Sequence, residues 1–305
     1  MADLTISEPV VTADGESAPN PTITVSTRSV SAASRTAFAA LIRRDLVVLR
    51  KNIFEFITRT LIQPFLLVFV FLYIFPTIGQ GIGAGTGGGG SAGGGAFANV
   101  LVPGVVGISI MFQGIQAVAM QLAQEFGFTR EIEDRVQAPC PIWMVAAAKV
   151  VSGAVQGVIA AVIVFPIASV VHAKGVHPHF AVTWWIVLTL VPLACLAMTS
   201  LGLWLGTIFE PRNLGLMFGF VVLPITFLGG TYYPWVALAP VKIGAFHWLQ
   251  TLVLINPLIY VIEGLRAGFT HVEHMHLYIV YPVVIAFGAA FFGLGIRGFR
   301  KRVLT

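Results

Sequence analysis

Long apolar runs dominate the chain from residue 60 onward. Blocks of roughly 20 predominantly apolar residues match the length at which a helix crosses a bilayer. Strands of a membrane barrel would be polar at every second residue, whereas these blocks are apolar on all sides. The pattern therefore predicts an all-α membrane protein with six transmembrane helices. Their approximate bounds are Thr60 to Gly79, Val100 to Gln121, Ile142 to Val171, Val182 to Thr207, Leu214 to Gly230 and Leu277 to Ile296.

The residues before the first span show two other patterns. Residues 1–34 are polar at the start and contain no apolar run of the kind found in a signal peptide, so we predict a disordered cytoplasmic tail. In residues 35–59, apolar side chains recur at helical spacing and basic ones lie opposite, which predicts an interfacial amphipathic helix. Asp45 falls on the apolar face and does not fit this pattern.

Composition and charge support the membrane class and give an orientation. The chain is 57% hydrophobic and 10% charged, far from the balance of a soluble domain. Seven Lys or Arg residues precede the first span, four follow the last and three lie in alternate loops, against three on the other side. The positive-inside rule then predicts a multi-pass cell membrane protein with both termini cytoplasmic. Lys149, near the inner end of the third span, is expected to snorkel. We interpret the basic residues as lipid contacts rather than a nucleic-acid site.

The predicted inner loop at residues 122–141 concentrates charge. Residues 60–124 contain no Asp, Glu, Lys or Arg, and six charges then follow within eleven residues. Their spacing gives two i,i+4 ion pairs on a short helix, and their sum is negative, so anionic lipid would repel the loop. We predict that it docks into another protein; a solvated loop with internal ion pairs is the alternative. The charges are Glu125, Arg130, Glu131, Glu133, Asp134 and Arg135.

The apolar run at residues 229–269 is interrupted too often to form one span. Glycine pairs and prolines break its helix pattern, and the six-span topology places both of its ends outside. It therefore predicts an outer re-entrant helical hairpin before the last span. Asn256 is expected to cap a helix that starts at Pro257, with Glu263 and Arg266 one turn apart near the surface.

Other candidate chemistry is weak. The glycine-rich stretch at residues 81–95 lacks the lysine of a phosphate-binding loop, so we interpret it as a flexible outer tether and expect this chain to bind no nucleotide or other cofactor. Two groups of histidines have spacing that could suit a metal, but we expect no metal site, because polar rings are ordinary at a membrane interface. These groups are His172, His177 and His179, and His271, Glu273, His274 and His276.

Three features in order resemble the type-2 ABC transmembrane domain, the permease half of bacterial ATP-driven exporters such as the daunorubicin/doxorubicin resistance permeases. They are the amphipathic helix before the first span, the inner loop "REIEDRVQAP", and the run Gly-Gly, Pro, Asn-Pro-Leu-x-Tyr and Arg before the last span. The resemblance implies a separate cytoplasmic ATPase subunit that holds ATP and Mg, a second permease to form a dimer, and no enzyme activity in this chain itself.

The resemblance also assigns roles to residues. It implies that the six inner-loop charges, Glu125 to Arg135, couple transport to the ATPase, and that the outer hairpin gates the exit. The candidate gate residues are Gly229, Gly230, Pro234, Asn256, Pro257, Tyr260 and Arg266. Uncharged spans suggest an apolar or amphipathic substrate, either a drug or antibiotic, as in multidrug resistance, or a lipid. The alternatives are a lipid-linked polysaccharide, an ion-coupled secondary carrier, an intramembrane transferase and an assembly subunit. The carrier is less expected, since Lys149 is the one ionisable residue within the predicted spans.

Overall fold

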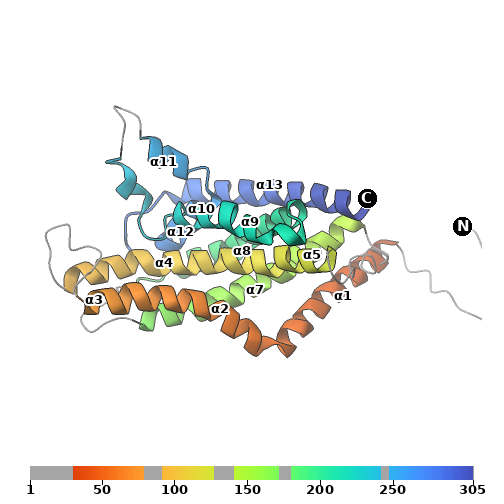
Figure 1. The fold of residues 1–305 in the computed structure, drawn as a ribbon, viewed down its shortest axis with the longest axis horizontal. Helices are drawn as coiled ribbons and strands as arrows, with labels where there is room; N and C mark the ends of the chain where they lie inside the picture. The colour runs from red at the N-terminus through yellow and green to blue at the C-terminus, as the bar shows by residue number, and fades with distance from the viewer. Residues whose placement is uncertain (1–29, 79–90, 127–140, 172–179, 242–246, 305) are drawn as a thin grey trace, which may run out of the picture.

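The computed structural model describes residues 30–78, 91–126, 141–171, 180–241 and 247–304, and the regular elements of these ranges are all helical (Figure 1). The α-helices are α1 (Val30–Lys51), α2 (Ile53–Val68), α3 (Phe75–Thr77), α4 (Ser91–Ile115), α5 (Gln121–Gln124), α7 (Ile142–Val170), α8 (Trp184–Ile208), α9 (Leu214–Met217), α10 (Leu223–Phe227), α11 (Trp248–Val253), α12 (Pro257–Phe269) and α13 (Leu277–Leu304). Short π-helical segments join α2 to α3, α4 to α5 and α9 to α10, at Phe69–Ile74, Gln116–Met120 and Phe218–Val222.

Five of the described helical segments are long and apolar enough to cross a membrane, and they confirm five of the six predicted spans. They are Ile53–Ile74, Phe97–Gln124, Ile142–Val170, Trp184–Ile208 and Leu277–Val303. The remaining predicted span corresponds to a shorter apolar stretch, Pro211–Phe227. At 1.5 Å per residue, this stretch is about 25 Å long, slightly less than the hydrocarbon core of about 30 Å.

The bundle has two distinct ends. The start of α1 and the end of α13 lie at the same end (Figure 1), here called the terminal end. The opposite end, here called the distal end, carries α11 and α12. Both ends of the described chain therefore lie at the terminal end.

The first helices differ from the sequence prediction at their boundaries. The amphipathic helix was predicted over residues 35–59, but α1 runs from Val30 to Lys51 and residues 53–59 belong to α2. Asn52 has φ −107° and ψ 27°, which is outside the helical region, so the chain changes direction there (Figure 1). The predicted tether is also shorter than expected, because residues 91–95 are already helical in α4. Its earlier part, residues 81–90, lies outside the described residues.

The centre of the bundle is formed by α4 and α8, which approach each other through glycine. The second span is 83% buried in its most apolar window, compared with 17% for the last span. A Cβ atom on Gly202 would lie 2.5 Å from the backbone oxygen of Gly114, which is closer than real contacts allow. The two backbones therefore touch directly, as in other membrane helix pairs that pack through small residues.

This contact predicts that Gly202→Ala destabilises the bundle. The added methyl group forces α4 and α8 apart, and overpacking of this kind typically costs about 1 to 3 kcal/mol. Thermal unfolding of the purified protein in detergent should show a clear loss of stability. Gly293→Ala is the control, since a Cβ at Gly293 in α13 meets nothing within 4 Å and alanine favours helix by about 1 kcal/mol. Equal behaviour of the two variants would contradict the close contact.

Candidate functional site

The polar cluster at the distal end is organised by α12. All 13 residues of α12 are buried. The Asn256 side chain accepts a hydrogen bond from the Leu258 backbone N–H at 3.0 Å, and its Nδ2 donates to the Ile225 carbonyl at 2.7 Å. The predicted cap is confirmed, and the same side chain also ties the start of α12 to α10.

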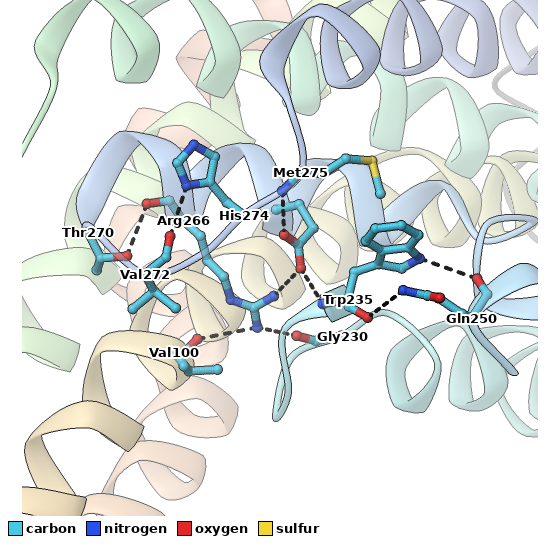
Figure 2. Close-up of polar contacts among 10 residues, drawn as sticks. Val100, Gly230, Trp235, Gln250, Arg266, Thr270, Val272, His274 and Met275 are labelled. Carbon is cyan, nitrogen blue, oxygen red and sulfur yellow. Dashed lines mark hydrogen bonds and ion pairs between the residues drawn. The ribbon is translucent and has the colours of Figure 1, made fainter. Parts of the chain in front are cut away.

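Glu263, in the middle of α12, is the centre of this cluster. Its Oε1 accepts hydrogen bonds from the Trp235 backbone N–H and from Arg266 Nη1, both at 2.7 Å. Its Oε2 accepts from the Met275 backbone N–H at 2.9 Å. One carboxylate thus joins α12 to the 3₁₀ segment at Trp235–Leu238 and to the segment leading into α13. Figure 2 labels Trp235 and Met275, which bind this carboxylate.

Arg266 extends the cluster to two more segments. Its Nη2 donates to the carbonyl of Gly230 and, at 3.5 Å, to the carbonyl of Val100 near the start of α4 (Figure 2). We predicted that Glu263 and Arg266 lie near the surface, which is wrong, since both side chains are 0% exposed. They are buried because α12 packs against α4, α8 and α13 together. We call Glu263, Arg266 and the four backbone groups that they bind the distal clamp.

The other predicted gate residues surround the distal clamp. Gly230 has φ 74°, a conformation that favours glycine, and it turns the chain after α10. A Cβ on Gly229 would lie 2.5 Å from Leu258. Tyr260 donates its hydroxyl hydrogen to the Leu254 carbonyl at 3.0 Å, in the turn before α12. Pro234 directly precedes the 3₁₀ segment at Trp235–Leu238.

Sequence reasoning missed the backbone partners of Glu263 and Arg266. Glu263 accepts from the backbone N–H groups of Trp235 and Met275. Arg266 donates to the carbonyl of Val100, and backbone groups leave no mark in a sequence. The available signal was Glu263, an acidic residue within an apolar helix and three positions before an arginine, a spacing that brings two side chains together.

At the terminal end, Glu125 forms a buried ion pair. Its Oε1 lies 2.7 Å from Lys149 Nζ, and the two side chains are 8% and 2% exposed. The expectation that Lys149 snorkels is therefore wrong: its ammonium group binds a carboxylate inside the bundle. Glu125 was grouped with the ATPase-facing charges, and the structure directs its Oε1 toward α7 instead. The other five, Arg130, Glu131, Glu133, Asp134 and Arg135, lie outside the described residues.

Polar contacts between α1, α2, α4 and α7 continue from this pair. Ser152 donates to Asp45 Oδ2 at 3.1 Å, which explains why an acidic residue stands on the apolar face of α1. Gln113 receives a hydrogen bond from Thr60 at 3.1 Å and donates one to Gln156 at 3.2 Å. Hydrogen bonds as well as apolar packing thus join α1, α2, α4 and α7.

Of the two predicted histidine groups, one can be placed. His172, His177 and His179 lie outside the described residues. In the second group, His274 Nδ1 lies 2.9 Å from the Val272 carbonyl, and the ring of His276 stacks on Tyr278 with centroids 5.2 Å apart. Within the described ranges, no three His, Cys, Asp or Glu residues are grouped as metal ligands would be.

Five long apolar helical segments in the described ranges define a multi-pass membrane protein. The profile of the ABC-2 type transporter family matches residues 36–270. The chain belongs to this family, whose members are the membrane permease subunits of ABC transporters and act with a separate ATPase subunit. The resemblance found in the sequence is confirmed.

Individual relatives agree with this assignment. The chain is 30% identical over 199 residues to the inner membrane transport permease YadH of Escherichia coli strain K12, a match that covers 65% of this chain and 72% of the relative. The same values hold for YadH of Escherichia coli O157:H7 and of Shigella flexneri.

The distal clamp predicts that Arg266→Met is strongly destabilising. The substitution leaves the Glu263 carboxylate buried without its charged partner, which typically costs about 3 to 5 kcal/mol. Arg212→Met is the matched control: Arg212 and Glu210 are also 2.7 Å apart, but their side chains are 81% and 50% exposed, and such surface pairs contribute about 0 to 1 kcal/mol. Thermal unfolding of both variants measures the difference, and equal losses would contradict the role assigned to the clamp.

Proposed function

We propose that this chain is the permease subunit of an ATP-driven exporter and that it works as a dimer with a second permease. Family membership supports the transport role. The direction rests on one observation: the distal end is closed by the buried clamp, whereas the terminal end contains a cavity of about 380 Å³ between α1, α2 and the bundle. A permease closed at one end and hollow at the other has the form of a loading state.

In the proposed topology the terminal end is cytoplasmic and the chain crosses the membrane six times. The start of α1 and the end of α13 lie at the same end of the bundle, as six crossings require. The excess of Lys and Arg at this end supports the cytoplasmic orientation. Pro211–Phe227 is the fifth crossing, slightly short for a bilayer, so it requires local thinning or help from residues 228–230.

The outer re-entrant hairpin in this proposal is formed by α11 and α12. The two helices meet at the turn of Leu254 and Asn256, which the Tyr260 hydroxyl and the Asn256 side chain hold in place. Glu263 and Arg266 fasten the hairpin to its neighbours. Two groups at this point, Arg266 Nε and Thr231 Oγ1, are buried without a hydrogen-bond partner among the described residues. Burying polar groups without a partner costs free energy. Opening the hairpin exposes these two groups to water and recovers part of this free energy, as a gate requires.

Coupling to the ATPase is assigned to residues 130–135. The Glu125–Lys149 ion pair anchors the chain just before this segment to α7, so a push on the loop is transmitted to the second and third spans. The proposed cargo is apolar or amphipathic, a drug, an antibiotic or a lipid. This choice is supported because the buried charges of the described residues are paired with one another, Glu125 with Lys149 and Glu263 with Arg266, and the other buried side chains are uncharged.

The coupling role predicts that the double reversal Glu131→Lys and Glu133→Lys weakens capture of the ATPase subunit. Loss of a buried charged contact between proteins typically costs about 2 to 5 kcal/mol, which is a factor of ten or more in affinity. The measurement is copurification of the ATPase subunit with the tagged permease, together with export of a fluorescent amphipathic dye.

The control for this prediction is Glu273→Lys, which reverses an exposed acidic residue at the distal end and should leave ATPase recovery unchanged. If the loop is merely solvated, the double reversal breaks only its own helix pairs, at about 0.5 kcal/mol or less. Normal recovery and normal export in the double reversal would remove the coupling role from residues 130–135.

The proposed topology predicts the labelling of introduced cysteines. With Cys140 and Cys195 replaced, cysteines at Ser91 and Gly175 should react with an impermeant thiol reagent added outside intact cells, because both positions precede or follow a span at the distal end. A cysteine at Asn213, at the start of the fifth crossing, should react only after the cells are opened. Labelling of Asn213 in sealed cells would rule out the six-span topology.

A further inference from the structure

The cavity at the terminal end has a mixed chemical character. It has a volume of about 380 Å³, within the usual range of ligand sites. Its apolar lining residues are Val48, Leu49 and Phe56, and its other lining residues are polar or charged. The charged lining residues are Arg44, Asp45, Glu55, Arg59 and Glu125.

Two of these charges have no partner in the described parts of the chain. Asp45 accepts a hydrogen bond from Ser152, and Glu125 pairs with Lys149, while Arg44 makes a further interaction of its own. By contrast, Glu55 and Arg59 form no hydrogen bond or ion pair with their side chains in the described parts of the chain. The cavity therefore presents one free carboxylate and one free guanidinium group.

Arg59 lies at a position where a charged side chain is energetically unfavourable. It belongs to the first span, Ile53–Ile74, and stands six residues, about 9 Å, along that helix. It also lines a second, smaller cavity with Thr60, Gln63, Gln113 and Gln116. A charged side chain at this depth in a membrane helix needs a polar partner and commonly marks a functional site. Arginine is well suited to bind phosphate oxygens through paired hydrogen bonds.

The spacing of the two free charges suggests what binds there. Glu55 and Arg59 are four residues apart on α2, so they share one face of the helix. We propose that the cavity binds the zwitterionic headgroup of a phospholipid, with its phosphate at Arg59 and its ammonium group at Glu55. Val48, Leu49 and Phe56 contact the glycerol and the first part of the acyl chains. Placement in the inner leaflet rests on the orientation proposed above, whereas the headgroup chemistry does not.

The test measures lipids that remain bound to the purified permease with its ATPase subunit. The complex is stripped of lipid in detergent, incubated with phosphatidylethanolamine or phosphatidylglycerol, and analysed by native mass spectrometry. The wild type should retain more phosphatidylethanolamine, because the ammonium group finds Glu55. Arg59→Gln should lower retention of both lipids at least about tenfold, as loss of a charged hydrogen-bond partner implies. Glu55→Gln should remove the preference and keep the binding of phosphatidylglycerol.

Further variants separate the site from general effects of charge and folding. Arg50→Gln, in an exposed part of α1 that lines neither cavity, should retain lipid like the wild type. Arg59→Lys keeps the charge and should bind within about a factor of ten of the wild type. Equal retention by Arg59→Gln and Arg50→Gln, or equal binding of the two lipids to the wild type, overturns the proposal. Displacement of the lipid by excess inorganic phosphate also overturns it, in favour of a free-phosphate site.

The same samples keep this inference separate from the proposed function. ATPase copurification is measured in parallel and should be unchanged in Arg59→Gln. If the wild-type permease captures no ATPase subunit, the proposed function fails while the lipid comparison still decides the headgroup site.

Discussion

The ion pair between Glu263 and Arg266 fixes the distal half of the molecule. Burying two charges is expensive, and a buried pair by itself is weak support for stability. Here the cost is offset because Glu263 also accepts two backbone N–H groups and Arg266 donates to two carbonyls. The pair thereby replaces missing helix hydrogen bonds in the irregular segments around α12. Without it, the turn at Gly230 and the entry to α13 would have unpaired backbone groups inside the bundle.

The terminal end uses the same chemistry in a more open arrangement. Glu125 binds Lys149 between α5 and α7, and Arg302 of α13 donates to the carbonyls of Gly206 and Phe209 at the end of α8, at 3.0 and 3.1 Å. Charged side chains thus fasten the terminal end of α8 and the segment that follows α5. The α1–α2 elbow is held by fewer such contacts, with Asp45 and Ser152 the clearest. Movement during transport is accordingly expected at the elbow before the central helices.

Much of this architecture was predictable because membrane helices can be recognised in a sequence by their length and hydropathy. Five spans and the Asn256 cap were predicted from local sequence. The family was predicted from three motifs that occur in a fixed order along the chain. The break at Asn52 did not follow, since the helical spacing of apolar residues continues through it. The distal clamp was missed for a different reason. Two partners of Glu263 are backbone groups 28 and 12 residues away, and no side-chain pattern encodes such distant contacts.

The position of Glu263 has a consequence for biosynthesis. Insertion of an isolated helix with a glutamate and an arginine into lipid is energetically unfavourable. The backbone groups that bind Glu263 lie on both sides of it in the chain, at Trp235 and Met275. Met275 emerges from the ribosome after α12 is complete. The segment must therefore wait at the membrane surface or within the insertion machinery until the beginning of α13 is available. The beginning of α13 is then needed to bring α12 into place, so the distal clamp is completed only after α13 has begun to emerge.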